Sequence, residues 1–144
     1  MNRGIVRAAA IVASALTVMF ASVVVAGREG SAKPVFTTDQ ATAGKAAYAK
    51  NCASCHLADL SGNVEIPPLA GETFLDTWKT KTTKDLRDYM SAAMPYGGPS
   101  LDADSYTVIT AFILSTNGAL AGTERLNAST RVPISDLIPR RVQH

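Results

Sequence analysis

The longest helical pattern in the chain lies in its second half. Its apolar residues recur every three or four positions, which predicts one buried face on an α-helix: Tyr106, Ile109, Phe112 and Ile113. The helix should begin near Asp102, and Asn117 and Gly118 are residues that commonly end one.

A second helix is predicted near position 40. Thr37 and Gln40 have the spacing of a capping box, in which each side chain bonds the backbone N–H of the other residue. The helix should continue through residues 41–50, with Gly44 and Tyr48 one turn apart on the same face.

The segment between these two helices has few regular patterns. Residues 57–72 contain Gly and Pro at turn spacing and are predicted to form a loop. A short helix is predicted over 74–79, and Thr82 or Thr83 can cap another over 84–93. No stretch alternates apolar and polar residues as a strand does, so the predicted fold class is all-α.

The N-terminal segment has the pattern of an export signal. Arg3 and Arg7 precede an uncharged apolar run over 8–26, and Val24-Val25-Ala26 offers small residues where a signal peptidase cuts. We predict a signal peptide over 1–26; the alternative is an uncleaved membrane anchor, because the run is only just shorter than a bilayer span. In either case the domain lies outside the cytoplasm.

The remaining chain divides into three predicted parts. Residues 27–36 form a polar tether, 37–122 form one domain, and 123–144 form an irregular C-terminal tail that partly packs on it. Residues 1–26 contain two arginines and no acidic residue, so removing them lowers the formal charge from +2 to zero. A neutral domain argues against a nucleic-acid partner, which requires a basic surface.

The chain has two cysteines, and both belong to one short motif. Cys52-Ala53-Ser54-Cys55-His56 is an attachment signature for c-type haem. Two thiols one turn apart can add to the two porphyrin vinyl groups, and the following histidine can then ligate iron. A thioredoxin-like pair would need a βαβ context, and a zinc site would need four ligands, for which only His144 remains as a further imidazole.

The second iron ligand is predicted to be a methionine. After the signal segment the chain has only Met90 and Met94. Met94 precedes Pro95, where a helix must end, so its side chain can leave the helix and reach across a flat ring. Met90 lies one turn earlier, where the simpler interpretation is an ordinary core residue.

Taken together, these motifs resemble the class I bacterial cytochromes c over about residues 38–122. The resemblance is carried by four motifs in this order: Gly44-x3-Tyr48-x3-Cys52-x2-Cys55-His56, Pro67-Pro68-Leu69-Ala70-Gly71, Met94-Pro95, and Ala111-Phe112-Ile113-Leu114. It implies three to five helices wrapped around one haem c, covalently bound through Cys52 and Cys55.

The resemblance also implies roles for individual residues. His56 would be the proximal iron ligand and Met94 the distal one. The carbonyl of Pro67, rather than that of Pro68, would accept a hydrogen bond from His56. Trp78 would pack on the haem edge or bond a propionate; a plain core tryptophan is the alternative.

With both axial positions filled, the expected function is one-electron transfer in the periplasm between a dehydrogenase and a terminal acceptor such as an oxidase. Some loop motifs are similar to those of cytochromes associated with quinoprotein (PQQ-dependent) dehydrogenases. The protein would be a monomer or a complex subunit, with membrane contact only through an uncleaved N-terminal segment. The alternatives are a fixed relay subunit, and a peroxidase or gas-binding haem if Met94 does not bind iron.

Overall fold

The computed structural model describes residues 33–98 and 100–138, and the predicted signal segment lies outside them. The described chain is helical and contains no strand, which confirms the all-α class. This part of the chain contains six helices: α1 (Thr38–Asn51), α2 (Ala53–His56), α3 (Glu72–Trp78), α4 (Thr83–Ala93), α5 (Ala103–Thr116) and α6 (Ile134–Leu137). Within these residues no helix is both long enough and apolar enough to cross a bilayer.

The three longer helices begin where the sequence predicts. Thr37 caps α1 in a full capping box with Gln40. Thr82, not Thr83, caps α4, again in a capping box, and Thr83 is buried as the first helical residue. Asp102 caps α5 by accepting from the Ser105 N–H. Each cap involves residues three apart, so local sequence is sufficient to place these starts.

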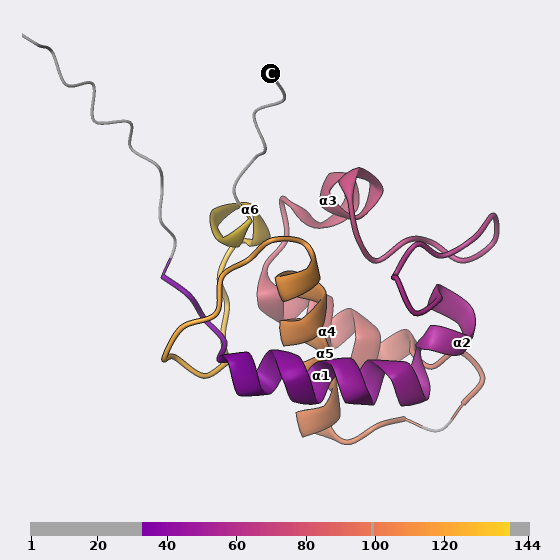
Figure 1. Ribbon diagram of the computed structural model, residues 1–144, viewed down its shortest axis with the longest axis horizontal. Coiled ribbons are helices and arrows are strands. Elements are labelled where there is room, and N and C mark those ends of the chain that lie inside the picture. The colour runs from indigo at the N-terminus through magenta and orange to yellow at the C-terminus, as the bar shows by residue number, and fades with distance from the viewer. Residues whose placement is uncertain (1–32, 99, 139–144) are drawn as a thin grey trace, which may run out of the picture.

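The core is organised by the crossing of α1 and α5 (Figure 1). The Tyr48 and Phe112 rings meet there with centroids 5.3 Å apart. A Cβ atom at Gly44 would lie 1.9 Å from the Val108 carbonyl oxygen, so only glycine allows this approach. The helices can therefore pack backbone against backbone, and α4 packs against α5 beside them.

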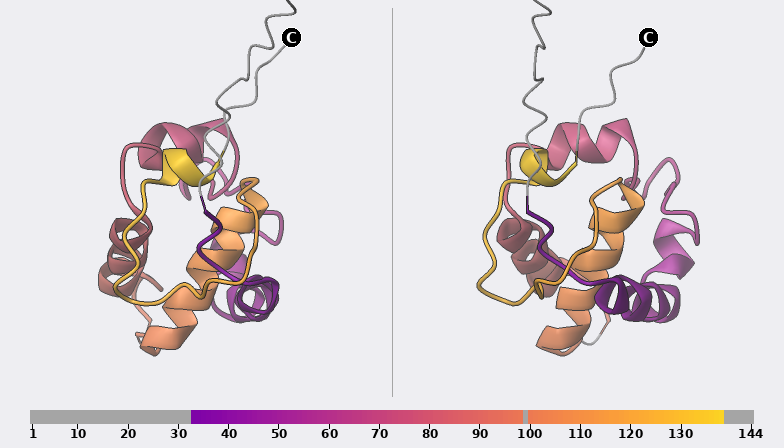
Figure 2. Two further views of the ribbon diagram at one scale, coloured as in Figure 1. Left: turned by 90° about the vertical axis from the view of Figure 1, so that its left-hand side faces the viewer. Right: turned by 60° about the vertical axis from the view of Figure 1, so that its left-hand side comes forward.

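The segment after α5 is more ordered than an irregular tail. It runs along one side of the molecule from the N-terminal end of α1 to α6, which lies beside α3 (Figure 2). Leu126, Ile134, Leu137 and Ile138 are buried in the core. The sixth helix, one more than the three to five implied by the resemblance, comes from this segment. Phe36, the last residue of the predicted tether, is also fully buried.

Two sets of polar contacts hold the segment in place. The buried Gln40 amide donates to the Leu126 carbonyl at 2.8 Å and accepts from the Leu126 N–H at 2.9 Å. Further along, the Thr83 hydroxyl donates to the Thr130 carbonyl at 2.7 Å, and the Ile134 N–H donates to the Lys81 carbonyl at 2.9 Å. The segment thereby joins the start of α1 to the start of α4.

This attachment makes Gln40 more important than an ordinary capping residue. We expect Gln40→Ala to lower the free energy of unfolding by about 2–3 kcal/mol, since it leaves both Leu126 backbone groups without a partner. Thr37→Ala removes the cap but keeps the Leu126 bonds, and should cost only about 1 kcal/mol. Denaturant unfolding of the haem-loaded protein measures both; equal losses would contradict the role assigned to the Leu126 bonds.

Candidate functional site

A cavity of about 810 Å³ lies between α2, the loop that follows it, and helices α3, α4 and α5. Its lining includes both cysteines, His56 and both methionines of the described chain. Much of the remaining lining is apolar or aromatic, including Leu69, Phe74 and Ile113. Its volume lies within the range of roughly 300–1,000 Å³ usual for ligand and cofactor sites.

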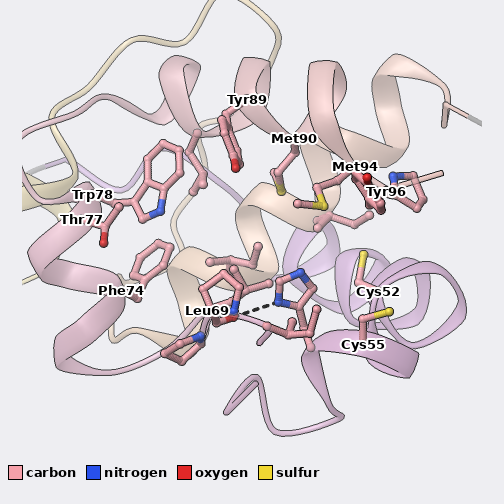
Figure 3. A pocket seen from close by; sticks show the side chains of 18 of the residues that line it. Cys52, Cys55, Leu69, Phe74, Thr77, Trp78, Tyr89, Met90, Met94 and Tyr96 are labelled. Atoms are coloured by element: carbon pink, nitrogen blue, oxygen red, sulfur yellow. Dashed lines mark hydrogen bonds between the residues drawn. The ribbon is translucent and has the colours of Figure 1, made fainter. Parts of the chain in front are cut away.

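The two cysteines are presented at the junction of α1 and α2. The Cys52 N–H ends α1 by donating to the Tyr48 carbonyl, and the Cys52 carbonyl accepts from the N–H groups of Cys55 and His56. This single turn places both cysteines side by side at one end of the cavity, where both belong to its lining (Figure 3). They are not joined to each other. Burial raises the pKa of the Cys52 thiol, with a smaller contribution from Cys55, and the Cys55 side chain is exposed.

His56 is buried, and its ring orientation is determined by a backbone group. Its Nδ1 lies 3.0 Å from the Pro67 carbonyl oxygen, and the side chain is 8% exposed. A carbonyl can only accept a hydrogen bond, so Nδ1 is the donor in this contact and Nε2 is the ring nitrogen not engaged by it. The arrangement therefore offers Nε2 as a metal ligand and anchors the other nitrogen.

The loop that supplies the Pro67 carbonyl folds back on α2. Gly62 N–H donates to the His56 carbonyl, and Asn63 N–H donates to the Ile66 carbonyl. Gly62 has a φ of +61°, and a Cβ atom there would lie 2.2 Å from the Ile66 oxygen and 2.9 Å from the Pro67 oxygen. The close turn at Gly62 is what allows the loop to bring this carbonyl to His56.

The start of the same loop is anchored by Tyr48, which is 1% exposed. Its hydroxyl donates to the Leu57 carbonyl at 2.7 Å, directly after His56. Burial, with smaller contributions from Cys52 and Asp59, raises the pKa of Tyr48 to about 12. The hydroxyl therefore remains a protonated donor at neutral pH.

Both methionines reach the cavity from the C-terminal end of α4. Figure 3 shows Met90 and Met94 side by side, and both line the cavity. Met90 is 8% exposed and lies in the last turn of the helix. Met94 is the C-cap residue, and its backbone is already extended (φ −130°, ψ 145°). The two sulfurs thus share one wall, and only Met94 has a backbone that has left the helix.

Trp78 lies on another wall, at the end of α3. It stacks on Phe74 with centroids 6.4 Å apart and meets the edge of Tyr89 at 5.4 Å. The Lys81 Nζ lies 5.8 Å from its ring centroid. Trp78 is a residue that the sequence predicts at the site, whereas Tyr89 and Lys81, which also line the cavity, are not. The i, i+4 spacing of Phe74 and Trp78 was the available signal for an aromatic wall.

Together, the fold and the cavity define a class of protein. The largely apolar cavity is lined by a donor set that fits haem c: two thiols one turn apart, an anchored imidazole and a thioether. The protein is a c-type cytochrome.

Comparison with known proteins assigns the family. Residues 39–113 match the family model described as cytochrome C oxidase, cbb3-type, subunit III, and the chain belongs to this family of cytochrome c domains. A cytochrome c domain implies haem c as the cofactor and electron transfer as the activity. No curated protein matches the chain.

A solved structure shares the fold. The sulfane dehydrogenase SoxCD from Paracoccus pantotrophus matches with a TM-score of 0.51 and 23% identity, over 78% of this chain and 67% of the other. At this identity the match supports the fold alone. Neither name is that of a quinoprotein dehydrogenase, so that association stays a prediction.

The turn at Gly62 can be tested with a matched pair of variants. Gly62→Ala and Gly118→Ala each place alanine at a positive φ, at a cost of about 1–2 kcal/mol. Gly118 has open space around it, whereas Gly62→Ala also meets the 66–67 backbone, which should add about 1–3 kcal/mol. Denaturant unfolding gives the difference, and the ¹⁵N NMR signal of the His56 Nδ1–H reports whether its bond to Pro67 is lost. Equal stability of the two variants would show that the loop adjusts freely.

Proposed function

We propose that this protein is a one-electron carrier of the periplasm that holds one haem c covalently through Cys52 and Cys55. In this proposal His56 and Met94 would be the two protein ligands of the iron. The observation that carries it is that two thiols, an imidazole hydrogen-bonded to the Pro67 carbonyl, and a thioether line one cavity. The predicted export segment over 1–26 supports the compartment.

The bound group would supply a ferrous–ferric couple, and the chain would set its properties. His56 offers Nε2, and its Nδ1–H bond to Pro67 keeps the ring from turning. The Met94 thioether, a soft ligand, favours the ferrous state. The apolar lining disfavours the additional charge of the ferric state, so both features raise the reduction potential.

Trp78 is proposed to pack on the edge of the haem. It lines the cavity between Phe74 and Tyr89, and the three rings support one another. Lys81 lies at the same wall, where a cation would favour a carboxylate of the bound group. This wall would hold the bound group in position, and the two methionines of the α4 end would lie beside that group.

Two forms of electron transfer are compatible with this site, namely a free shuttle and a fixed relay. The family description names an oxidase subunit, and the structural match is to a dehydrogenase. Both names favour electron transfer to or from a larger redox enzyme. We infer that the donor or acceptor is such an enzyme and keep the fixed relay subunit as the second candidate.

Isosteric substitutions separate the two methionines. Met94→Leu should abolish the weak far-red absorption band of the ferric protein, which reports sulfur ligation, and should lower the reduction potential. Met90→Leu should retain the band and cost less than about 1.5 kcal/mol of stability, because the volume is conserved. Visible spectra and potentiometric titration of the haem-loaded variants give both results.

Spectra without the far-red band would indicate a different function. If wild-type protein has covalent haem but no far-red band, and binds carbon monoxide readily, the iron is open on one side. The peroxidase or gas-binding alternative would then replace the carrier. If Met90→Leu alone loses the band, the axial ligand is Met90 and the carrier function remains.

Purification from the native host under gentle conditions separates shuttle from relay. A free shuttle should elute from size-exclusion chromatography at the size of a single chain. Co-elution with a dehydrogenase or oxidase, in constant proportion and resistant to high salt, would instead identify a fixed subunit. The salt wash is the control, since weak electrostatic encounters dissociate when charges are screened.

A further inference from the structure

Tyr106 connects α5 to the backbone of Met94, one of the two methionines that line the cavity. It lies in the first turn of α5 and is 3% exposed. Its hydroxyl donates to the Met94 carbonyl at 2.6 Å and accepts from the Leu101 N–H at 3.0 Å. One hydroxyl therefore connects the end of α4 to the segment that leads into α5.

The hydroxyl completes the backbone bonding of Met94. The Met94 N–H donates to the Met90 carbonyl as the last helical bond of α4. Its carbonyl is among those that a helix leaves without an internal partner, and Tyr106 supplies that partner. Both backbone polar groups of Met94 are thereby held, while its side chain alone enters the cavity.

Tyr106 is itself fixed in place. Its backbone N–H donates to the Asp102 carbonyl, and its own carbonyl accepts from the Thr110 hydroxyl at 2.8 Å. Its ring belongs to the buried core together with Ile109 and Ile113 of the same helix. The position of the Met94 backbone is therefore set by a helix that contributes no iron ligand.

We propose that Tyr106 is a positioning residue for the distal ligand: its hydroxyl holds Met94 at the iron and limits how often the thioether leaves. This inference rests on the proposed function, in which Met94 is an axial ligand. A methionine held only by its own bond to iron is released more often than one whose backbone is fixed. An added ligand that needs the vacated position binds in proportion to the released fraction.

Imidazole titration of the ferric, haem-loaded protein measures that fraction. Tyr106→Phe keeps the ring in the core and removes only the hydroxyl. We expect it to bind imidazole about tenfold more tightly than wild type, equivalent to about 1.4 kcal/mol. Loss of the far-red band during the titration follows the displacement of Met94.

Tyr48→Phe is the matched control. Tyr48 is equally buried and also donates to a loop carbonyl, that of Leu57, on the histidine side of the cavity. It should lose comparable stability but bind imidazole within about twofold of wild type. Equal tightening in the two variants, or none in Tyr106→Phe, would overturn the proposal.

A double-variant cycle tests whether Tyr106 acts through Met94. In Met94→Leu no thioether has to leave, so adding Tyr106→Phe should not change imidazole affinity. An unchanged tenfold effect in that background would mean that Tyr106 controls access to the cavity, and the proposal would fail. If Met94→Leu itself keeps the far-red band, the proposed ligation is wrong, which is a different result from failure of the Tyr106 proposal alone.

Discussion

The close approach of α1 and α5 is the constraint on which the rest of the structure depends. At Gly44 the helix backbones are so near that no other residue fits against the Val108 carbonyl. This crossing places the C-terminal end of α1, with the first cysteine, beside the cavity that α5 also lines. It turns two separate helices into one rigid frame, and the ligand-bearing segments are attached to that frame.

The donor side chains lie at helix ends, next to segments with little regular structure: His56 is the last residue of α2, and Met94 is the C-cap of α4. The loop after His56 is closed by the turn at Gly62, and Met94 stands where α4 ends. Each segment accepts a hydrogen bond from a buried tyrosine of the α1–α5 pair: Tyr48 of α1 bonds the loop, and Tyr106 of α5 bonds Met94. On both sides of the cavity a buried hydroxyl donates to a backbone carbonyl: Tyr106 gives the Met94 carbonyl its partner, and Tyr48 adds a second donor to the Leu57 carbonyl, which also accepts from the Leu60 N–H. Such an arrangement suits electron transfer, because ligands that do not move need no rearrangement when the charge on the iron changes.

The segment after α5 extends this frame. Its bonds to Gln40, Thr83 and Lys81 connect the start of α1 with the wall formed by α3 and α4. That wall bears Trp78 and Tyr89, so the C-terminal segment contributes to the shape of the cavity without lining it. The sequence of this segment has no helical period beyond one turn, and its burial depends on distant partners. For that reason local sequence patterns predict only an irregular tail here.

Local chemistry determined what the sequence alone could establish. The capping boxes at Thr37 and Thr82 act between residues three apart, so the sequence alone indicates where these helices start. The Cys52–His56 motif is contained within one turn, so the c-type haem chemistry also follows from the sequence. The all-α class follows from local patterns in the same way. Tertiary structure decided the contacts between residues far apart: that Met90 shares the cavity with Met94, that Tyr89 joins Trp78, and that Tyr106 reaches the Met94 carbonyl. No pattern marks these partners, because their distances depend on how α4 and α5 pack, and packing depends on the whole core rather than on neighbouring residues.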